Sequence, residues 1–546
     1  IAAEVEVVDG NDRVTVYYSY DQASTNLNDG LTFNAFALPT ETIAIKTFAS
    51  IPLSNAGSQF KGFAGRIDTT GDDVPVISSN MEACFMAATI PVDGYGNVDR
   101  WDTAAATTMK DVFKNNAIFN KTIYFWNTSN VTTMESMFEN ATAYDQIIPY
   151  QSTNINGRQY FSWDTSNVVT MARMFKNATT FNSSINSWRN NLTSLESMES
   201  MFENASTYNQ SLNDWIVTNV INMSSLFRNA VDYDSQITNW TPTSVQNMQS
   251  MFEGAVKFDQ LISSWNTASL QNTSFMFKNA FSFNRRLDWN MTGVTTMESM
   301  FENAVTYNFP ISQWNTANVT TMANMFYKAN DFNQDLGSII IAKVADMTQM
   351  LEKTAVNGSN YSNTLIGWAG QADTIQSGVN FSIGTEVLFY GNALFARDTL
   401  TNDYNWKITD GGANTDYAGL SEDPTELFTV NGILSIENAL FDLDPDGNTD
   451  SHDHVLFNIP IKQRLSSLTL TTFSTSDPNA RVYYDLQKGD RVDQIANTTT
   501  TRVIQSSFTI DDLGSNLIPE IVYGSTDDEA GTNYSLLLYG TGDISL

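Results

Sequence analysis

The sequence predicts a repeat solenoid between two β-rich flanks, and three observations support this fold class. The pattern Met-x-x-Met-Phe recurs eleven times, mostly at intervals of 25 residues, and a Trp follows most copies at a constant distance. Alternating β-type segments lie before and after the repeats. Repeats of this length are typical of coils that bury their hydrophobic face by stacking on neighbouring coils. The repeated segments close at Phe85, Phe113, Phe138, Phe175, Phe202, Phe227, Phe252, Phe277, Phe301, Phe326 and Leu351.

The N-terminal flank, residues 1–75, predicts a small β domain or an N-terminal cap. Alternating residues at Val5–Val8, a turn at Asp9–Asp12 and a second run at Arg13–Tyr20 are typical of a β-hairpin. This segment could shield the first coil or serve as an attachment module. The sequence alone leaves both roles open.

Within a coil, Met134, Met137, Phe138 and Ala141 have the i, i+3, i+4, i+7 spacing of one helix face. We therefore predict one short strand plus one short, two-turn helix per coil, with this face in the core. Two residues after the Phe comes a residue type that tolerates the left-handed conformation ending a helix. These positions are Asn115, Asn140, Asn177, Asn204, Asn229, Gly254, Asn279 and Asn303.

Farther along each coil, an aromatic residue is always followed by Asn or Asp, as in Tyr144-Asp145 and Phe181-Asn182. A short polar side chain in register predicts a ladder that bonds to turn backbone. The repeated Met and Trp side chains are interpreted as core, and Cys84 as a buried small residue in a Met position. Extra residues at 147–160 predict a surface loop.

The residue directly after the Phe alternates in charge through eight consecutive coils. In a stack, equivalent positions are neighbours, so each charge would lie between two opposite charges. We interpret the series as a structural charge ladder that sets the register of the coils, since exposed ion pairs add little stability. Its members are Lys114, Glu139, Lys176, Glu203, Arg228, Glu253, Lys278 and Glu302.

The runs at 126–146, 240–260 and 314–334 share the pattern WNTSNVTTMESMFENATAYDQ and resemble the BspA-type leucine-rich repeat surface proteins. The segment YNWKITDGG at 404–412 is similar to the one that closes such arrays. The resemblance covers residues 76–412, with a closing cap at 352–412, and implies a leucine-rich-repeat-like solenoid on an extracellular, often adhesive protein. It implies no catalytic residue. Cys84, Thr273 and Leu351 depart from the pattern.

The C-terminal flank, residues 413–546, predicts an antiparallel β-sandwich. Its β-type runs recur between turn signals, and several short strands in this arrangement are typical of a sandwich. The runs VLFNIPI and RVYYDLQKGD resemble the jelly-roll domains appended to secreted bacterial enzymes. The predicted strands are Val455–Ile461, Leu465–Phe473, Arg481–Leu486, Arg502–Ile510, Ile518–Tyr523 and Tyr534–Tyr539.

The segment DLDPDGNTDSHD in this flank predicts a calcium site. Alternate carboxylates converge on a hard cation, and Gly447 allows the sharp turn between them. The last position is Asp in place of Glu, and a strand follows, so an acidic surface loop is the alternative. His452 and His454 could bring a transition metal to the same loop. The predicted ligands are Asp442, Asp444, Asp446, Asn448, Asp450 and Asp453.

Composition excludes several function classes. Lys plus Arg number 28 and Asp plus Glu 60, so the formal net charge is −32, which disfavours nucleic acid as a partner. One cysteine and two histidines leave little for nucleophilic or zinc chemistry, and no apolar run is long enough to span a membrane. A start at Ile1 suggests that a leader or precursor segment has been removed.

These observations predict a non-enzymatic extracellular, cell-surface or virion-surface protein whose rigid solenoid serves adhesion. Its partner would be a protein or a glycan on a host or neighbouring cell. The alternative is a structural subunit of a virion, fibre or cell-surface layer that assembles with copies of itself through its terminal β domains. A secreted hydrolase carrying these modules is disfavoured, because no acid/base pair or nucleophile stands out.

Overall fold

The computed structural model describes residues 2–9, 12–19, 42–48, 53–69, 73–75, 77, 79–148, 153–155, 158–160, 163–372, 374–390, 393–414, 452–460, 469–475, 481–488, 490–499, 503–509, 533–541 and 544–545. The chain divides into two units. The first contains Ile1–Phe389 and Ala396–Gly412, and the second contains Tyr390–Phe395 and Ala413–Leu546.

A four-stranded sheet begins the first unit. Its strands are β1 (Ala2–Asp9), β2 (Asp12–Ser19), β3 (Thr42–Thr47) and β4 (Arg66–Ile67), in the order β2-β1-β3-β4. The predicted hairpin is confirmed, since β1 and β2 pair antiparallel from Ala2 opposite Ser19 to Asp9 opposite Asp12. β3 pairs antiparallel with β1 and parallel with β4, which joins the hairpin to the coils.

The stack of coils begins before residue 76. The backbone amides of Ser58, Phe60 and Gly62 donate to carbonyls of the coil that closes at Phe85, and the Phe60 ring stacks on Phe85 at 5.1 Å. The boundary predicted at residue 75 therefore falls after a coil that already belongs to the stack. The sequence pattern misses this coil because it lacks both Met residues and keeps the central Phe alone.

The backbone of each Met-x-x-Met-Phe segment divides its hydrogen bonds between two directions. Every second amide donates to a carbonyl of the next coil, and from the second Met onward the amides between them donate to a carbonyl three residues earlier in the same coil. In one coil the first set is Met134 to Thr170, Ser136 to Ala172, Phe138 to Met174 and Asn140 to Lys176, at 2.8 to 3.0 Å. The second set is Met137 to Met134, Glu139 to Ser136 and Ala141 to Phe138.

The predicted short helix in each coil is therefore wrong: from Trp101 to Ala345 the described residues contain no α-helix. An α-helix uses its amides internally, which would leave none for the neighbouring coil. The predicted left-handed conformation is confirmed at all eight Asn or Gly positions two residues after the Phe, with φ between 55° and 69°. A second left-handed column, two residues before the Phe, was not predicted; it includes Ser136, Arg173 and Phe275.

Each predicted strand is reduced to one bridge residue per coil. Parallel bridges join successive coils from Asn80 to Asp346, and every bridge residue is Asn, Thr, Ser or Asp. Its side-chain oxygen accepts a hydrogen bond from the amide two residues later, as Thr133 does from Glu135 at 3.2 Å. The bridge residues are Asn80, Thr108, Thr133, Thr170, Ser197, Asn222, Asn247, Asn272, Thr296, Thr321 and Asp346.

Stacked aromatic rings fill the core of the coils. From Phe85 to Phe326 the repeated Phe rings stack at centroid distances of 5.4 to 5.7 Å. A second column of Phe and Tyr runs from Phe119 to Phe332 at 5.6 to 6.3 Å. The Met, Phe and Trp side chains are buried, as predicted, and Cys84 is buried among them. Each large side chain contributes about 1.5 to 3 kcal/mol on full burial.

The predicted polar ladder beside the second aromatic column is confirmed. Asn120 accepts from the backbone amide of Asp145 at 3.1 Å, and Asp145 accepts from that of Asn182 at 2.9 Å. The same bond repeats at every step to the amide of Asn357. One oxygen per coil thus satisfies a turn amide of the next coil.

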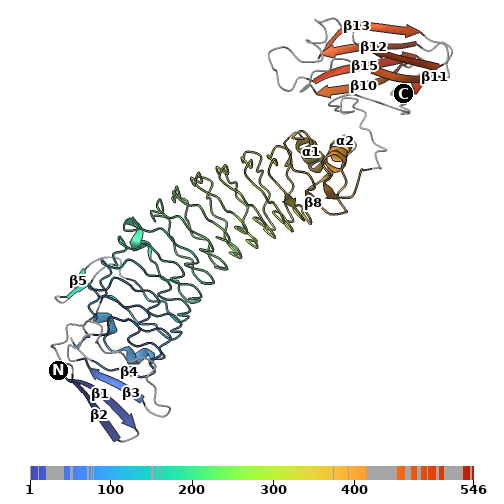
Figure 1. Cartoon of the computed structure of the whole chain (residues 1–546). Coiled ribbons are helices and arrows are strands. Elements are labelled where there is room, and N and C mark those ends of the chain that lie inside the picture. The colour runs from blue at the N-terminus through green and yellow to red at the C-terminus, as the bar shows by residue number, and fades with distance from the viewer. Residues whose placement is uncertain are drawn as a thin grey trace. The chain divides into compact units, whose positions relative to one another are not determined.

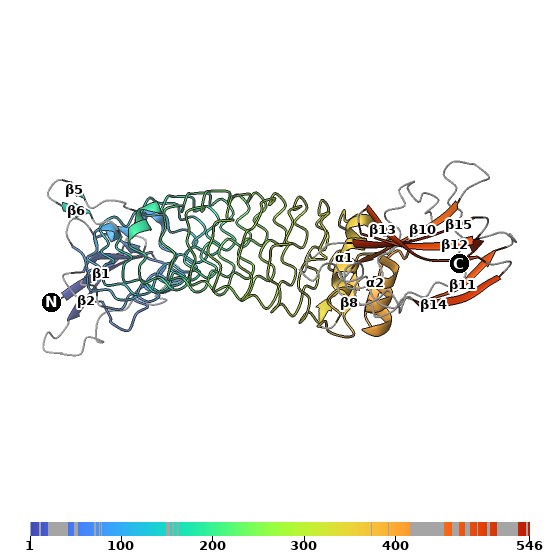
Figure 2. The same ribbon diagram turned by 90° about the horizontal axis from the view of Figure 1, so that it is seen from above.

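The extra residues after Ile147 contain an antiparallel hairpin, β5 (Thr153–Ile155) with β6 (Arg158–Tyr160), which projects from the side of the coils (Figures 1 and 2). In most coils the Trp indole donates to a carbonyl of the preceding coil, as Trp240 does to Leu212 at 2.7 Å. Four indoles lack this bond and are buried without a hydrogen-bond partner: Trp101, Trp163, Trp188 and Trp215.

Helices cover the C-terminal end of the first unit. β7 (Asp346–Met347), β8 (Asn380–Ser382) and β9 (Lys407–Thr409) form a parallel sheet beside α1 (Gly358–Ala369), α2 (Leu394–Asp398) and a π-helix at Thr399–Asp403. Asn357 caps α1 by accepting from the amide of Asn360 at 2.9 Å. Among the described residues before these helices, short 3-10 helices occur at Val92–Tyr95, Val98–Arg100 and Asn186–Asn190.

The second unit contains two antiparallel sheets. One has the order β10-β15-β12-β13, with β10 at His452–Pro460, β15 at Asn533–Thr541, β12 at Arg481–Lys488 and β13 at Asp490–Thr499. The other has the order β14-β11-β16, with β14 at Val503–Thr509, β11 at Thr469–Thr475 and β16 at Ile544–Ser545. Five of the six predicted strands overlap these elements. β13 was not predicted, and Ile518–Tyr523 lies outside the described residues.

The substitution Tyr208→Phe should leave stability at neutral pH unchanged or raise it by up to about 1 kcal/mol, because the buried Tyr208 hydroxyl has no hydrogen-bond partner. Burial also raises the pKa of Tyr208 well above its ordinary value of 10.0. The unfolded chain therefore loses this proton first, and stability falls as the pH rises above about 10. Denaturant unfolding at pH 7 and pH 11 should show a smaller alkaline loss in the variant.

The half-exposed Tyr327 is the matched control for the loss of a hydroxyl group, and Tyr327→Phe should change stability at pH 7 by less than about 0.5 kcal/mol. An equal alkaline loss in wild type and Tyr208→Phe would contradict the expectation.

The substitution Asn204→Ala should lower the free energy of unfolding by about 1 to 2 kcal/mol. Alanine is strained in the left-handed conformation, and the substitution removes two hydrogen bonds of the Asn204 side-chain amide. The Asn204 side chain donates to Asn177 at 2.7 Å and accepts from Asn229 at 2.9 Å. Asn204→Gly should lower the free energy of unfolding by less than Asn204→Ala, because glycine adopts the left-handed conformation without strain, as Gly254 does in its own coil. A lower melting temperature for Asn204→Gly than for Asn204→Ala would contradict this expectation.

Candidate functional site

Two exposed faces of the coil stack carry regularly spaced side chains. The turn face consists of the charge ladder and the residues three positions before each repeated Phe, such as Lys110, Glu135 and Glu199. The bridge face consists of the bridge residues and, from Thr108 to Asp346, the exposed residue that precedes each of them. These preceding residues are Thr107, Thr132, Val169, Glu196, Ile221, Gln246, Gln271, Thr295, Thr320 and Ala345.

The charge ladder forms ion pairs between adjacent coils, in three groups. Lys114 pairs with Glu139 at 3.1 Å and Lys278 with Glu302 at 2.9 Å. Between them, Lys176, Glu203, Arg228 and Glu253 form a chain with N–O distances of 2.8, 3.5 and 3.2 Å. The described ion pairs do not join Glu139 to Lys176 or Glu253 to Lys278. The continuous ladder that the sequence predicted is therefore interrupted twice.

Glu203 is the most enclosed carboxylate of the turn face, since its side chain is 9% exposed and lies between Lys176 and Arg228. Lys114 shows the competing effects. Burial lowers the pKa of the Lys114 amine, but the hydrogen bonds and charges of Glu139 and Asp111 outweigh burial, and the pKa is raised. The Lys114 amine is thus held in its charged form by carboxylates of its own coil and of the next coil.

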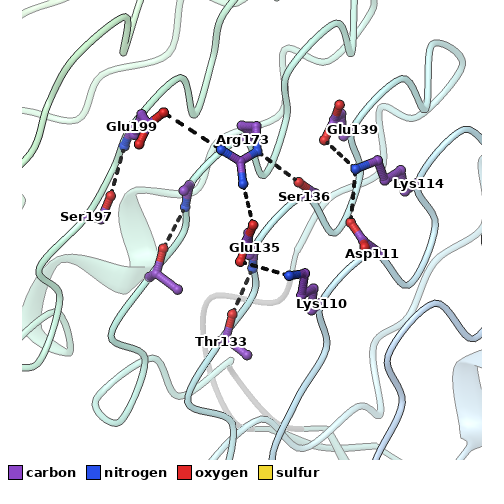
Figure 3. A network of polar contacts seen from close by, with 12 residues as sticks. Lys110, Asp111, Lys114, Thr133, Glu135, Ser136, Glu139, Arg173, Ser197 and Glu199 are labelled. Carbon is purple, nitrogen blue, oxygen red and sulfur yellow. Dashed lines mark hydrogen bonds and ion pairs between the residues drawn. The ribbon is translucent and has the colours of Figure 1, made fainter. Parts of the chain in front are cut away.

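A second group of charges crosses the turn face near its N-terminal end (Figure 3). Glu135 pairs with Lys110 at 3.4 Å and with Arg173 of the following coil, and Arg173 also reaches Glu199 at 3.7 Å. Lys114 contacts Asp111 of its own coil at 3.3 Å. This group was not predicted, because Lys110, Asp111 and Arg173 each occur in a single coil. No periodic signal marks them.

The arrangement of the turn face is suited to holding coils together. Its cations are paired with carboxylates that come from adjacent coils, so both partners are used within the chain. An anionic ligand would have to displace these carboxylates to reach Lys176 or Arg228. The ion pairs of the turn face therefore link neighbouring coils, and their cations are not available to bind an anion.

The predicted calcium ligands Asp442, Asp444, Asp446, Asn448 and Asp450 lie outside the described residues. Asp453 lies in β10 together with His452 and His454, where the backbone alone is described. Within the described ranges, no group of three or more His, Cys, Asp or Glu is placed to hold a metal ion. The calcium site stays a prediction.

A buried carboxylate occurs in the cap that closes the first unit. Asp410 is 2% exposed and accepts from Arg397 at 2.9 Å, from the Tyr361 hydroxyl at 2.6 Å and from the Gly412 amide at 3.1 Å. These three donors satisfy the carboxylate. Asp410 therefore ties α1, α2 and the segment after β9 together, which is a structural role.

The bridge face has the opposite electrostatic character. The ten residues from Thr107 to Ala345 that precede the bridge residues form a preceding column, and all ten are exposed. Glu196 is the one charged residue among these ten. Thr107, Thr132, Thr295 and Thr320 each donate their hydroxyl proton to a backbone carbonyl of the preceding coil, at 3.0 to 3.3 Å. Their outward oxygen lone pairs act as hydrogen-bond acceptors, and their methyl groups supply small apolar contacts.

Among the described helices, none has the length and apolar composition needed to cross a membrane. A family model described as "Mycoplasma protein of unknown function, DUF285" matches three consecutive segments, residues 79–215, 196–289 and 287–364. Together the segments span residues 79–364, just over half of the chain, and contain the coils that close at Phe85 to Leu351. No curated protein and no solved structure matches the chain.

The substitution Glu203→Ala should lower the free energy of unfolding by about 1 to 2 kcal/mol, because it leaves Lys176 and Arg228 without their shared carboxylate. The exposed Glu196, which lies in the same coil but on the bridge face, is the matched control, and Glu196→Ala should change stability by less than about 0.5 kcal/mol. Equilibrium denaturation in low and in 1 M salt measures both. Equal effects of the two substitutions would show that the turn-face pairs contribute nothing.

Proposed function

We propose, because the chain belongs to the family described as Mycoplasma protein of unknown function, DUF285, that it is a non-enzymatic extracellular repeat protein that binds partners along the side of its coils. The sequence resembles BspA-type surface proteins, which supports an adhesive role at a cell surface. In this interpretation the coils form a leucine-rich-repeat-like solenoid, and the second unit is a β-sandwich with a calcium loop at Asp442–Asp453.

The observation that carries the proposal is the bridge face. It repeats the same exposed backbone geometry at every coil, because parallel bridges join the coils from Asn80 to Asp346. In addition, the residue directly before each bridge residue, from Thr107 through Ala345, donates its backbone amide to a carbonyl of the coil before it. Side chains mounted on such a rigid frame lose little conformational entropy on binding, which favours affinity for an extended partner.

The core offers no competing explanation for these side chains. The Phe, Met and Trp columns are buried, and the turn-face charges are used between coils. The preceding column of the bridge face makes no side-chain contribution to the core, since all ten residues are exposed. Their composition is therefore available for recognition, and a protein or a glycan on a host or neighbouring cell would be the partner.

A structural subunit that assembles with copies of itself is the second candidate. The observation that favours it is β2, an eight-residue strand at one end of the sheet order β2-β1-β3-β4. An edge strand presents amides and carbonyls that can pair with another chain. Assembly through β2 would make the first unit one element of a fibre or layer.

The purified full chain should be monodisperse and monomeric by light scattering, both with calcium and with a chelator, and should bind to animal cells in a saturable manner. Negative-stain electron microscopy checks the absence of polymers in the same samples. Calcium-dependent sheets or fibres would overturn the adhesive function in favour of the structural subunit. Monomers that bind neither cells nor extracellular matrix would overturn both.

A further inference from the structure

We infer that the bridge face binds a neutral, linear polysaccharide laid lengthwise across successive coils. This inference rests on the proposed function and names the chemical class of its ligand. The candidate surface is the column Thr107, Thr132, Val169, Glu196, Ile221, Gln246, Gln271, Thr295, Thr320 and Ala345, together with the bridge residues beside it.

The charge of the chain and of the bridge face disfavours charged partners. The chain carries a formal net charge of −32, which repels anionic polymers. A cationic partner would be drawn to carboxylates, but the exposed column contains Glu196 alone and the bridge residues contain Asp346 alone. A surface that is nearly uncharged on a strongly acidic protein is electrostatically matched to an uncharged ligand.

Hydrogen-bond geometry selects for hydroxyl groups. In the exposed column, Thr132 and Thr320 have committed their protons to backbone carbonyls at 3.2 and 3.0 Å, so they offer acceptors outward. In the neighbouring column, Thr133 and Thr321 accept from backbone amides at 3.2 and 3.3 Å, which leaves their protons for donation. A sugar hydroxyl both donates and accepts hydrogen bonds. It can therefore donate to the exposed column, which offers acceptors, and accept from the neighbouring column, which offers donors.

The apolar parts of the surface fit the same ligand. Val169 and Ile221 are 39% and 40% exposed on either side of Glu196, and each Thr adds a methyl group. These contacts are small and suit the C–H faces of sugar rings. Gln246 and Gln271 extend the polar surface along the next two coils with side-chain amides.

Repetition selects for a polymer. One equivalent position recurs at every coil from Thr107 to Ala345, on a backbone held by hydrogen bonds to the coils on both sides. A ligand with one repeating unit engages many positions at once, and each added contact is intramolecular once the first has formed. A short oligosaccharide gains little from this effect, so affinity should rise with chain length.

The test uses the purified full chain and a panel of neutral linear polysaccharides, comprising α- and β-linked glucans, a mannan and a galactan, with an anionic polysaccharide for comparison. At least one neutral polymer should bind, and its oligomers of a few sugar units should bind at least about tenfold more weakly. Affinity electrophoresis and calorimetry measure both.

Two matched pairs of residues separate the bridge face from the rest of the coil. Thr132 and Thr142 are exposed threonines of one coil that each donate to a carbonyl of the preceding coil, at 3.2 and 3.3 Å. Gln246 and Gln236 are both exposed. The double variant T132K/Q246K should lose at least about tenfold in affinity for the neutral polymer, whereas T142K/Q236K should stay within about twofold of wild type.

The outcomes distinguish the inference from the proposed function. Cell binding without binding to any neutral polysaccharide overturns the inference and leaves the adhesive function standing. Equal losses in the two double variants also overturn it, because the site would then lie elsewhere. Stronger binding of T132K/Q246K to the anionic polymer, with none to a neutral one, would identify an ionic ligand and overturn the inference as well.

Discussion

The structure depends on how each Met-x-x-Met-Phe segment divides its backbone amides. Half of them donate to the same coil and half to the next, so the coil has a fixed local shape and a fixed neighbour at once. Within this segment, the bonds between coils have one direction. The peptide unit that accepts from one coil, such as the carbonyl of Thr133 from the Met109 amide, donates through the Met134 amide to the following coil. Four such columns per coil align their peptide dipoles along the stack.

Residue choice follows from this backbone. Alternating bond directions require left-handed residues two positions before and two positions after the repeated Phe, at a cost of about 1 kcal/mol or more for most residue types. Asn lowers this cost and adds a side-chain bond to the next Asn, as in the pair Asn140 and Asn115 at 2.6 Å. Gly254 interrupts the series of side-chain bonds, since it adopts the same left-handed conformation at φ 69° but has no side chain to donate to Asn229.

The same division of bonds separates the surfaces of the coil by role. Turn-face charges such as Lys176, Glu203 and Arg228 come from successive coils and neutralise one another. The bridge face needs short polar residues at the bridges and leaves the preceding position exposed and unconstrained by the core. A stack held together by its turns can therefore present a recognition surface at its bridges without losing cohesion.

The sequence by itself determined the coils, the buried columns of Met, Phe and Trp, the left-handed Asn positions and the polar ladder from Asn120. These features repeat in every coil, and periodicity reports them directly. Irregular features carried no such signal: the coil around Phe60 and the contacts of Arg173 each occur once. The spacing of Met134, Met137 and Phe138 was interpreted as a helix, since a helix and a series of turns can both place i, i+3 and i+4 on one side. Only the tertiary structure decided between them, because the choice depends on whether an amide finds its acceptor in its own coil or in the next.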